Sequence, residues 1–273
     1  MAIITAADGT ELYVRDWGSG RPVVLIHGWP LSGASWENQA VPLAEAGYRV
    51  IAYDRRGFGR SGQPWGGHDY DTLADDLAAV IDGLRLEGAA LYGFSMGGGE
   101  VARYMSRHEG RGVAKAGLVA SIAPGLLKGP GNQDGAGPEV FEGMMDGLRA
   151  DRAEFMRGFA RAFYGQGTAQ GGVSEGVLDW HWGTAMQASL RATIECVRAF
   201  GFTDFTADMP ALAGVPVQVL HGTGDEIVPI GISGHRVKQA IPAAELVEYE
   251  GAPHGLLATH AEAVTRDMLA FLK

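Results

Sequence analysis

The sequence predicts an α/β fold with a mostly parallel sheet and one helical insertion. Strand-like and helix-like segments alternate in residues 1–124 and again in residues 210–273, as they do when parallel strands are joined by right-handed crossovers. The alternation stops in residues 125–209, where only helical patterns occur. A Gly-x-Ser-x-Gly pattern at residues 93–97 stands where a strand-like segment turns into a helix.

Residues 1–124 contain short apolar segments separated by turn residues, which is typical of buried strands. Thr72 and Asp75 have the spacing of a capping box, and apolar residues at helical spacing follow, so we expect a helix to begin there. A second helix is expected over 96–108, directly after the serine motif. The expected strands are ELYVRDW (11–17), RPVVLIHG (21–28), YRVIAYD (48–54), GAALYGF (88–94) and KAGLVAS (115–121).

Residues 125–209 are rich in Phe, Met and Trp and show helical stretches at 138–150, 151–165 and 184–200. We interpret this part of the chain as a lid inserted into the α/β domain. The glycine-rich stretch 126–138 leads into it and is expected to be a mobile linker. The predicted organisation is therefore an N-terminal core (1–124), a helical lid (125–209) and a C-terminal core (210–273).

Residues 210–273 return to the α/β pattern. Strands are expected at 215–222 and 244–251, with a helix near 231–241 between them. Thr259 and Glu262 have the spacing of a capping box for a last helix.

Composition narrows the class of partner. The formal net charge of −10 argues against nucleic acid and anionic membranes, so we expect a small-molecule partner. No apolar run is long enough to cross a bilayer, and the first residues lack the basic-then-apolar pattern of a secretory signal. A single cysteine, Cys196, suits a reducing compartment, and we expect a cytoplasmic protein.

Ser95 is the predicted nucleophile. A turn from strand directly into helix strains its corner residue toward positive φ, and glycines at 93 and 97 allow the strand and helix to approach closely. The turn lifts the hydroxyl above the carboxyl edge of the sheet, where α/β folds bind ligands. It also aims the N-terminus of a helix at developing negative charge.

A serine nucleophile needs a base and an acid that orients the base. Among eight histidines we favour His254, which lies after the last strand and follows every plausible acid. His27 ends a strand beside a tight turn, where a structural role is expected. Asp225 lies just past a strand end and is the expected acid, because the alternative position after residues 115–121 carries no carboxylate. Its neighbour Glu226 is expected to face solvent or the lid.

The oxyanion hole is expected to use two backbone N–H groups, one from Met96 and one from Trp29 in the turn HGWP. His254 would take the Ser95 proton, Ser95 would form an acyl-enzyme, and a second nucleophile would release the acid. Such chemistry needs no metal and no organic cofactor. The sequence contains no HExxH motif, no paired-cysteine metal motif and no Gly-x-Gly-x-x-Gly after a strand.

The chain resembles the α/β-hydrolase superfamily over nearly its whole length. Within that superfamily it is similar to the bacterial cofactor-free haloperoxidases, also called perhydrolases, and to related aryl esterases. The resemblance rests on VVLIHGWPLSGASWENQ, YRVIAYDRRGFGRSGQP, DYDTLADDL, YGFSMGGGEVARYMSRH, VLHGTGDEIVPI and EGAPHGLLATH.

This resemblance implies an eight-stranded, mostly parallel sheet with helices on both faces and a helical lid. It also implies the triad Ser95, Asp225 and His254, an oxyanion hole from Trp29 and Met96, and a homo-oligomer. The implied reactants are a small carboxylic ester, its carboxylic acid and hydrogen peroxide. The departures from the family pattern fall in the insertion, in DGAGPEVFEGMMDG and GQGTAQGGVSEG, which are the segments expected to set the acyl group.

Four apolar residues are expected to line the acyl pocket: Trp29, Phe141, Phe159 and Ile227. The loop DRRGFGRS could bind an anion through Arg55 and Arg56, but a tight loop held by ion pairs is the favoured interpretation. Two alternative functions stay open at this point. One is a γ-lactamase or amidase with the same triad, and the other is a hydrolase-fold binding protein without turnover. A dehalogenase is not favoured, because it needs a carboxylate where Ser95 stands.

Pro30 carries a further hypothesis. Proline fixes its own φ and restricts the preceding residue, so it affects the carbonyl orientation of Trp29. A correctly turned carbonyl would accept a hydrogen bond from peroxide at the acyl-enzyme. We therefore expect Pro30 to favour peracid formation over hydrolysis.

Overall fold

A single eight-stranded sheet forms the centre of the molecule. The computed structural model describes residues 2–273. The strand order is β1-β2-β4-β3-β5-β6-β7-β8. β2 pairs antiparallel with both β1 and β4. The six strands β3 to β8 are parallel to one another, so the predicted mostly parallel α/β-hydrolase sheet is confirmed. The strands are β1 (Ala2–Thr5), β2 (Glu11–Gly18), β3 (Pro22–Ile26), β4 (Arg49–Tyr53), β5 (Ala89–Phe94), β6 (Val113–Val119), β7 (Val217–Gly222) and β8 (Glu245–Tyr249).

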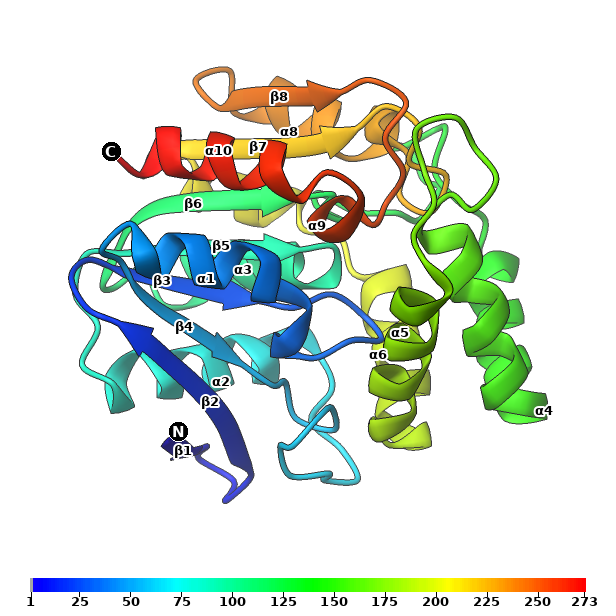
Figure 1. Cartoon of the computed structure of the whole chain (residues 1–273), viewed down its shortest axis with the longest axis horizontal. Coiled ribbons are helices and arrows are strands. Elements are labelled where there is room, and N and C mark those ends of the chain that lie inside the picture. Colours follow the sequence, from blue (N-terminus) through cyan, green and yellow to red (C-terminus); the bar gives the residue numbers. More distant parts are fainter. Residues whose placement is uncertain (1) are drawn as a thin grey trace.

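Helices cover both faces of this sheet (Figure 1). α1 (Glu37–Glu45), α9 (Leu256–Thr259) and α10 (Ala261–Leu272) lie on one face, and α2 (Tyr70–Gly83), α3 (Met96–Arg107) and α8 (Gly234–Ala240) lie on the other. The short helix α7 (Met209–Leu212) contacts α3 and α8. Alternate residues of the parallel strands face each layer, so the buried apolar side chains form two clusters, one beneath each set of helices.

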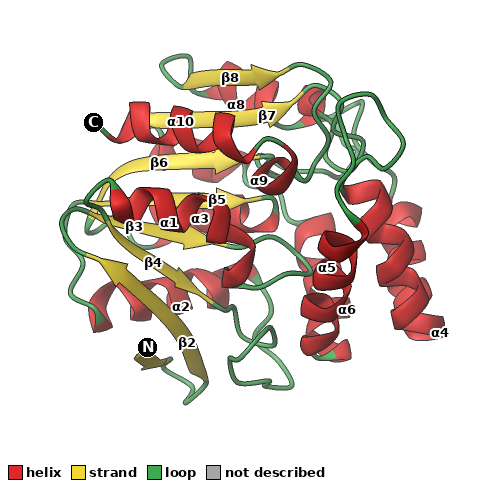
Figure 2. Cartoon of the chain, viewed as in Figure 1, coloured by secondary structure: helices red, strands yellow, loops and turns green. Residues whose placement is uncertain are grey.

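Three helices inserted between β6 and β7 lie beyond the carboxyl ends of the parallel strands (Figure 2). They are α4 (Pro138–Phe163), α5 (Glu175–Gln187) and α6 (Leu190–Phe202). α4 is kinked at Asp151, which has non-helical φ and ψ of −155° and 92°. The helix expected over 184–200 is broken at Ala188, and Ser189 caps α6 by accepting a hydrogen bond from the Ala192 N–H.

The structure corrects both predicted capping boxes. α2 begins at Tyr70, and its cap is Asp69, which accepts from the Thr72 N–H at 3.0 Å. Asp75 pairs instead with Arg107 and His108. The last helix has no side-chain cap, since the Thr259 hydroxyl donates back to the Gly255 carbonyl. Both places have the spacing of a capping box. However, α2 begins after the earlier residue Asp69, and α10 begins directly after the short helix α9.

No helix within residues 2–273 is long and apolar enough to cross a bilayer.

Candidate active site

Ser95 occupies the sharp turn between β5 and α3. Its φ of 52° and ψ of −116° make it one of few non-glycine residues with positive φ. Such a conformation costs free energy, and the neighbouring backbone holds it in place. A side chain at position 93 would collide with the Gly97 backbone, and one at position 97 would collide with the Ile26 carbonyl. The glycines of the motif therefore let β5, α3 and β3 meet where the serine turns outward.

Ser95, His254 and Asp225 form a continuous chain of hydrogen bonds. His254 Nε2 lies 2.9 Å from Ser95 Oγ, and His254 Nδ1 lies 2.7 Å from Asp225 Oδ2. All three side chains are buried, with at most 6 % of their surface exposed. The structure brings the three predicted residues together in the order nucleophile, base and orienting acid.

Both carboxylate oxygens of Asp225 have partners. Oδ1 accepts hydrogen bonds from the N–H groups of Ile227 and Val228 at 2.9 and 2.8 Å. Burial alone would raise the pKa of Asp225, but attraction to His254 and hydrogen bonds from His221 and His254 outweigh it and hold the pKa below the ordinary range. The carboxylate therefore stays ionised and orients the imidazole.

A cavity of about 500 Å³ opens in front of Ser95 and His254. Helices α4 and α6 and the segments after β6 and β7 supply most of its apolar wall. All four residues expected to line an acyl pocket lie in this wall. The lining is Trp29, Ser95, Met96, Ile122, Leu126, Asp134, Ala136, Val140, Phe141, Met144, Phe159, Phe200, Glu226, Ile227, Val228, Pro229, Ile232 and His254.

Trp29 joins the β3 loop to the inserted helices. Its indole N–H donates to the Thr193 carbonyl of α6 at 3.1 Å, and its ring packs edge-on against Phe159 and Phe200. The backbone beside Trp29 lies against Ser95, because a Cβ at Gly28 would sit 3.1 Å from the Cβ of Ser95. The positions expected to supply the oxyanion hole, Trp29 and Met96, thus flank Ser95 on the cavity wall.

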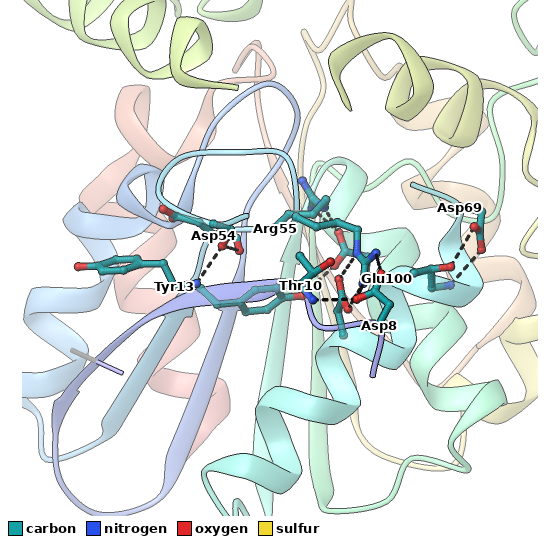
Figure 3. Close-up of polar contacts among 12 residues, drawn as sticks. Asp8, Thr10, Tyr13, Asp54, Arg55, Asp69 and Glu100 are labelled. Atoms are coloured by element: carbon teal, nitrogen blue, oxygen red, sulfur yellow. Dashed lines mark hydrogen bonds and ion pairs between the residues drawn. The ribbon is translucent and has the colours of Figure 1, made fainter. Parts of the chain in front are cut away.

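Arg55 and Arg56 are turned away from the cavity. Each is 1 % exposed, which leaves no surface for an anionic substrate. Arg55 pairs with Glu100 of α3, and Arg56 with Asp76 and Asp8, as the dashed contacts in Figure 3 show in part. Asp54 is not their partner, since it accepts from the N–H groups of Gly33 and Arg60. The favoured interpretation of a loop held by ion pairs agrees with these contacts, although the acids come from other elements.

Two buried histidines lie near Ser95, His254 and Asp225. A structural role was expected for His27, whereas His181 had no clear sequence signal. His27 is fully buried between Arg55 and the loop that carries Trp29. His181 of α5 is also fully buried and contacts Phe163, which in turn packs edge-on against His254. The contacts of His27 agree with the expected structural role, whereas the burial of His181 follows from long-range packing, which residue type and spacing do not indicate.

Among residues 2–273, no three histidine, cysteine, aspartate or glutamate side chains are arranged to hold a metal ion.

The chain is similar in sequence and in structure to several known proteins. Residues 21–172 match a family model described as the alpha/beta hydrolase fold. The chain is 46% identical over 276 residues to a non-heme chloroperoxidase of Streptomyces lividans, covering 100% of both chains. It is 41% identical to a bifunctional esterase/perhydrolase of Acinetobacter calcoaceticus, again covering 100% of both. The crystal structure of a bromoperoxidase from Bacillus anthracis superposes with a TM-score of 0.94 at 42% identity, covering 99% of each chain.

Proposed function

The chain belongs to the α/β-hydrolase family, and we propose that it is a serine esterase of small carboxylic esters that also makes peracids from hydrogen peroxide. The observation that carries the proposal is the unbroken hydrogen-bond chain from Ser95 through His254 to Asp225 beneath an apolar cavity. Relatives named as a chloroperoxidase and as an esterase/perhydrolase, each aligned over the full chain, support the same activity.

Ester hydrolysis follows from the roles of the three residues. His254 takes the proton of Ser95 as the Ser95 oxygen attacks the ester carbonyl, and Asp225 stabilises the imidazolium that forms. The N–H groups of Trp29 and Met96 stabilise the negative charge on the carbonyl oxygen. His254 then protonates the leaving alcohol. An acyl group remains on Ser95, and water deprotonated by His254 releases the acid.

Peracid formation differs only in the second nucleophile. Hydrogen peroxide gives its proton to His254 and attacks the acyl carbon, and the Ser95 oxygen leaves and regains a proton. The product is a peroxycarboxylic acid. Halide oxidation then takes place away from the protein, because the peracid transfers its terminal oxygen to the halide and becomes the carboxylic acid. This sequence accounts for halogenation without a bound metal or organic cofactor.

The two alternative functions are not favoured. A connected triad beneath an open cavity is what turnover requires, and a binding protein has no need of it. The full-length relatives reported above are named for haloperoxidase and esterase/perhydrolase activity, which favours esters over strained amides.

Three finer expectations belong to the same proposal. The inserted helices act as a lid over the cavity, because α4 and α6 supply much of its wall. The protein is a homo-oligomer, which sedimentation velocity at micromolar concentration would test. It acts in the cytoplasm, which suits its single, buried cysteine.

The proposal is tested by Ser95→Ala, which removes the nucleophile. We expect the variant to lose both p-nitrophenyl acetate hydrolysis and peracetic acid formation by at least about a thousandfold. Ser19→Ala, in the exposed turn before β3, serves as the control and should keep both activities. Retention of either activity in Ser95→Ala would mean that Ser95 does not carry the acyl group.

Pro30→Leu tests the second nucleophile separately. We expect the ratio of perhydrolysis to hydrolysis to fall severalfold, because leucine relaxes the backbone restriction next to the Trp29 carbonyl. The measurement is peracid and acid formed from one acetyl ester over a range of peroxide concentrations. An unchanged ratio would reduce Pro30 to a turn residue and leave the esterase proposal intact.

A further inference from the structure

The buried side chain of His27 holds the loop that carries Trp29, and the proposed mechanism gives His27 no part. His27 directly precedes Gly28 and has no exposed surface. Its Nδ1 lies 2.9 Å from the Gly28 carbonyl oxygen, and its Nε2 lies 2.9 Å from the backbone N of Arg55. The ring therefore spans the gap between the β3 loop and the β4 loop.

These partners fix which ring nitrogen carries the proton. The Arg55 N–H can only donate, so Nε2 must accept, and the Gly28 carbonyl can only accept, so Nδ1 must carry the proton. The opposite tautomer would offer Nδ1 only the Arg55 guanidinium at 3.3 Å and would set two donors against each other at Nε2. Burial, and next the Arg55 charge, lowers the pKa of His27 well below its ordinary range, so the ring is neutral.

The Gly28 carbonyl belongs to the same peptide unit as the Trp29 N–H. A peptide unit is planar, so fixing the direction of its carbonyl fixes the direction of its N–H. The Gly28 carbonyl accepts from His27 Nδ1 and also from the Leu31 N–H at 3.0 Å. Hydrogen bonds accepted at a carbonyl also polarise the N–H of that unit.

The second oxyanion-hole donor is held in a comparable way, but by backbone alone. The Ser95 carbonyl shares a peptide unit with the Met96 N–H and accepts from the N–H groups of Gly98 and Ile122 at 2.9 and 3.3 Å. Within residues 2–273, His27 is the one side chain that donates to either of these two carbonyls. A substitution of His27 can therefore alter the Trp29 N–H donor without changing a group that contacts the substrate.

Arg55 connects the backbone at His27 to α3, the helix that follows Ser95. Its guanidinium donates to the His27 carbonyl at 2.6 Å and pairs with Glu100 of α3 (Figure 3). Glu100 also accepts from the Tyr53 hydroxyl at 2.8 Å. The backbone around His27 and the helix that begins at Met96 are consequently joined through one buried ion pair.

We propose that neutral His27 is a positioning residue that aims and polarises the Trp29 N–H at the oxyanion through the Gly28 carbonyl. This inference rests on the proposed function, because it matters only if an oxyanion forms at Ser95. His27 does not touch the substrate. Its effect is carried entirely by the Gly28–Trp29 peptide unit.

Two conservative variants separate the two ring nitrogens. In His27→Gln the side-chain oxygen lies near the position of Nε2, so it can accept from Arg55 but offers no donor to Gly28. In His27→Asn the side-chain nitrogen lies near the position of Nδ1, so it can donate to Gly28 but leaves Arg55 without an acceptor. Only the first variant should impair the oxyanion hole.

For His27→Gln we expect kcat for p-nitrophenyl acetate to fall about tenfold, with KM changed less than about twofold. Removal of a whole oxyanion-hole donor costs roughly a hundredfold or more, and loss of its orientation costs less. Affinity for a trifluoromethyl ketone, which adds to Ser95 as an oxyanion, should fall in parallel with kcat. His27→Asn should restore most of both quantities while unfolding at lower urea. His68→Gln, at a buried histidine outside the cavity wall, is the matched control and should change neither.

Wild-type kcat and ketone affinity in His27→Gln would overturn the proposal. So would equal losses in both His27 variants with unchanged ketone affinity. If neither variant folds, ¹⁵N NMR of the wild-type protein decides, because we expect the Nδ1–H tautomer and the Nε2–H tautomer would contradict us. The Ser95→Ala variant distinguishes the two proposals. If it loses activity, the proposed esterase function stands even when the His27 variants contradict the role of His27.

Discussion

At the scale of single residues, burial decides what each ionisable group can do. Asp225 is buried but has partners at both oxygens, so it remains charged and useful to His254. His181, on α5, has the opposite surroundings. Its Nδ1 lies 3.2 Å from the Tyr164 hydroxyl, and its Nε2 has no protein partner within residues 2–273. Burial, and next the charge of His254, lowers the pKa of His181 to about 3.

This difference predicts a loss of stability in acid. Between the unfolded pKa of about 6.5 and the folded value of about 3, the unfolded chain binds the His181 proton and the folded chain does not. The free energy of unfolding therefore decreases as pH falls through this window, by about 2 kcal/mol from this residue at pH 5. His181→Asn removes the titration and should weaken the pH dependence by that amount. Urea unfolding of both proteins at pH 8 and pH 5 measures it, and parallel changes would refute the assignment.

At the level of single helices, α2 shows that Asp69, and not Thr72, caps the first turn. The sequence pattern points to Thr72, whereas the helix begins two residues earlier with Asp69 as its cap. We expect Asp69→Ala to lower the free energy of unfolding by about 1 kcal/mol and Asp69→Asn to keep most of it. Thr72→Val keeps the backbone donor and should cost less than Asp69→Ala. The reverse order in urea unfolding would show that Thr72 is the cap.

The inserted helices should set the acyl preference. Phe159 of α4 is half-buried in the cavity wall, whereas Phe141 is buried and packs against Phe200 and Phe202. We expect Phe159→Ala to raise the preference for hexanoyl over acetyl esters about tenfold in kcat/KM, because it opens space for added methylenes. Phe141→Ala should shift the preference in the same direction while losing about 3–5 kcal/mol of stability.

The comparison uses a p-nitrophenyl ester series. Phe271→Ala, near the C-terminal end of α10 and outside the cavity lining, is the control and should keep the wild-type profile. An unchanged profile in both cavity variants would remove these two residues from the acyl pocket.

At the scale of the whole molecule, charge favours some esters over others. The chain carries a net charge of −10, and the cavity lining includes the exposed carboxylates Asp134 and Glu226 but no lysine or arginine among residues 2–273. Negative potential at an entrance repels anionic substrates, and salt screens this repulsion.

We therefore expect a hemisuccinate ester to react more slowly than a neutral ester of similar size. Raising ionic strength from 0.01 to 0.15 M shortens the screening length from about 30 Å to about 8 Å and should raise its kcat/KM about threefold. The neutral ester should show no such change. The Asp134→Asn/Glu226→Gln double variant should lose most of the salt dependence, and a dependence that persists would place the repulsion elsewhere on the surface.

Local sequence patterns predicted the alternation of strands and helices and the three residues of the proposed triad. Strand and helix periodicities are local, so β2 to β8 and the helices α2 and α3 could be predicted from short windows. Ser95 was predictable as the candidate nucleophile because a strand–turn–helix with glycines at 93 and 97 is itself a local requirement. His254 and Asp225 were predictable from chain order and from the absence of a carboxylate after β6.

Which distant groups meet depends on the tertiary structure. His254 is separated from Ser95 by 159 positions, and Arg55 from Glu100 by 45, so their contacts depend on how the sheet packs and not on spacing. The ring partners of His27 belong to the same class. Each is a choice among several locally acceptable conformations, and the free energy that separates them comes from burial and hydrogen bonds supplied by other parts of the chain.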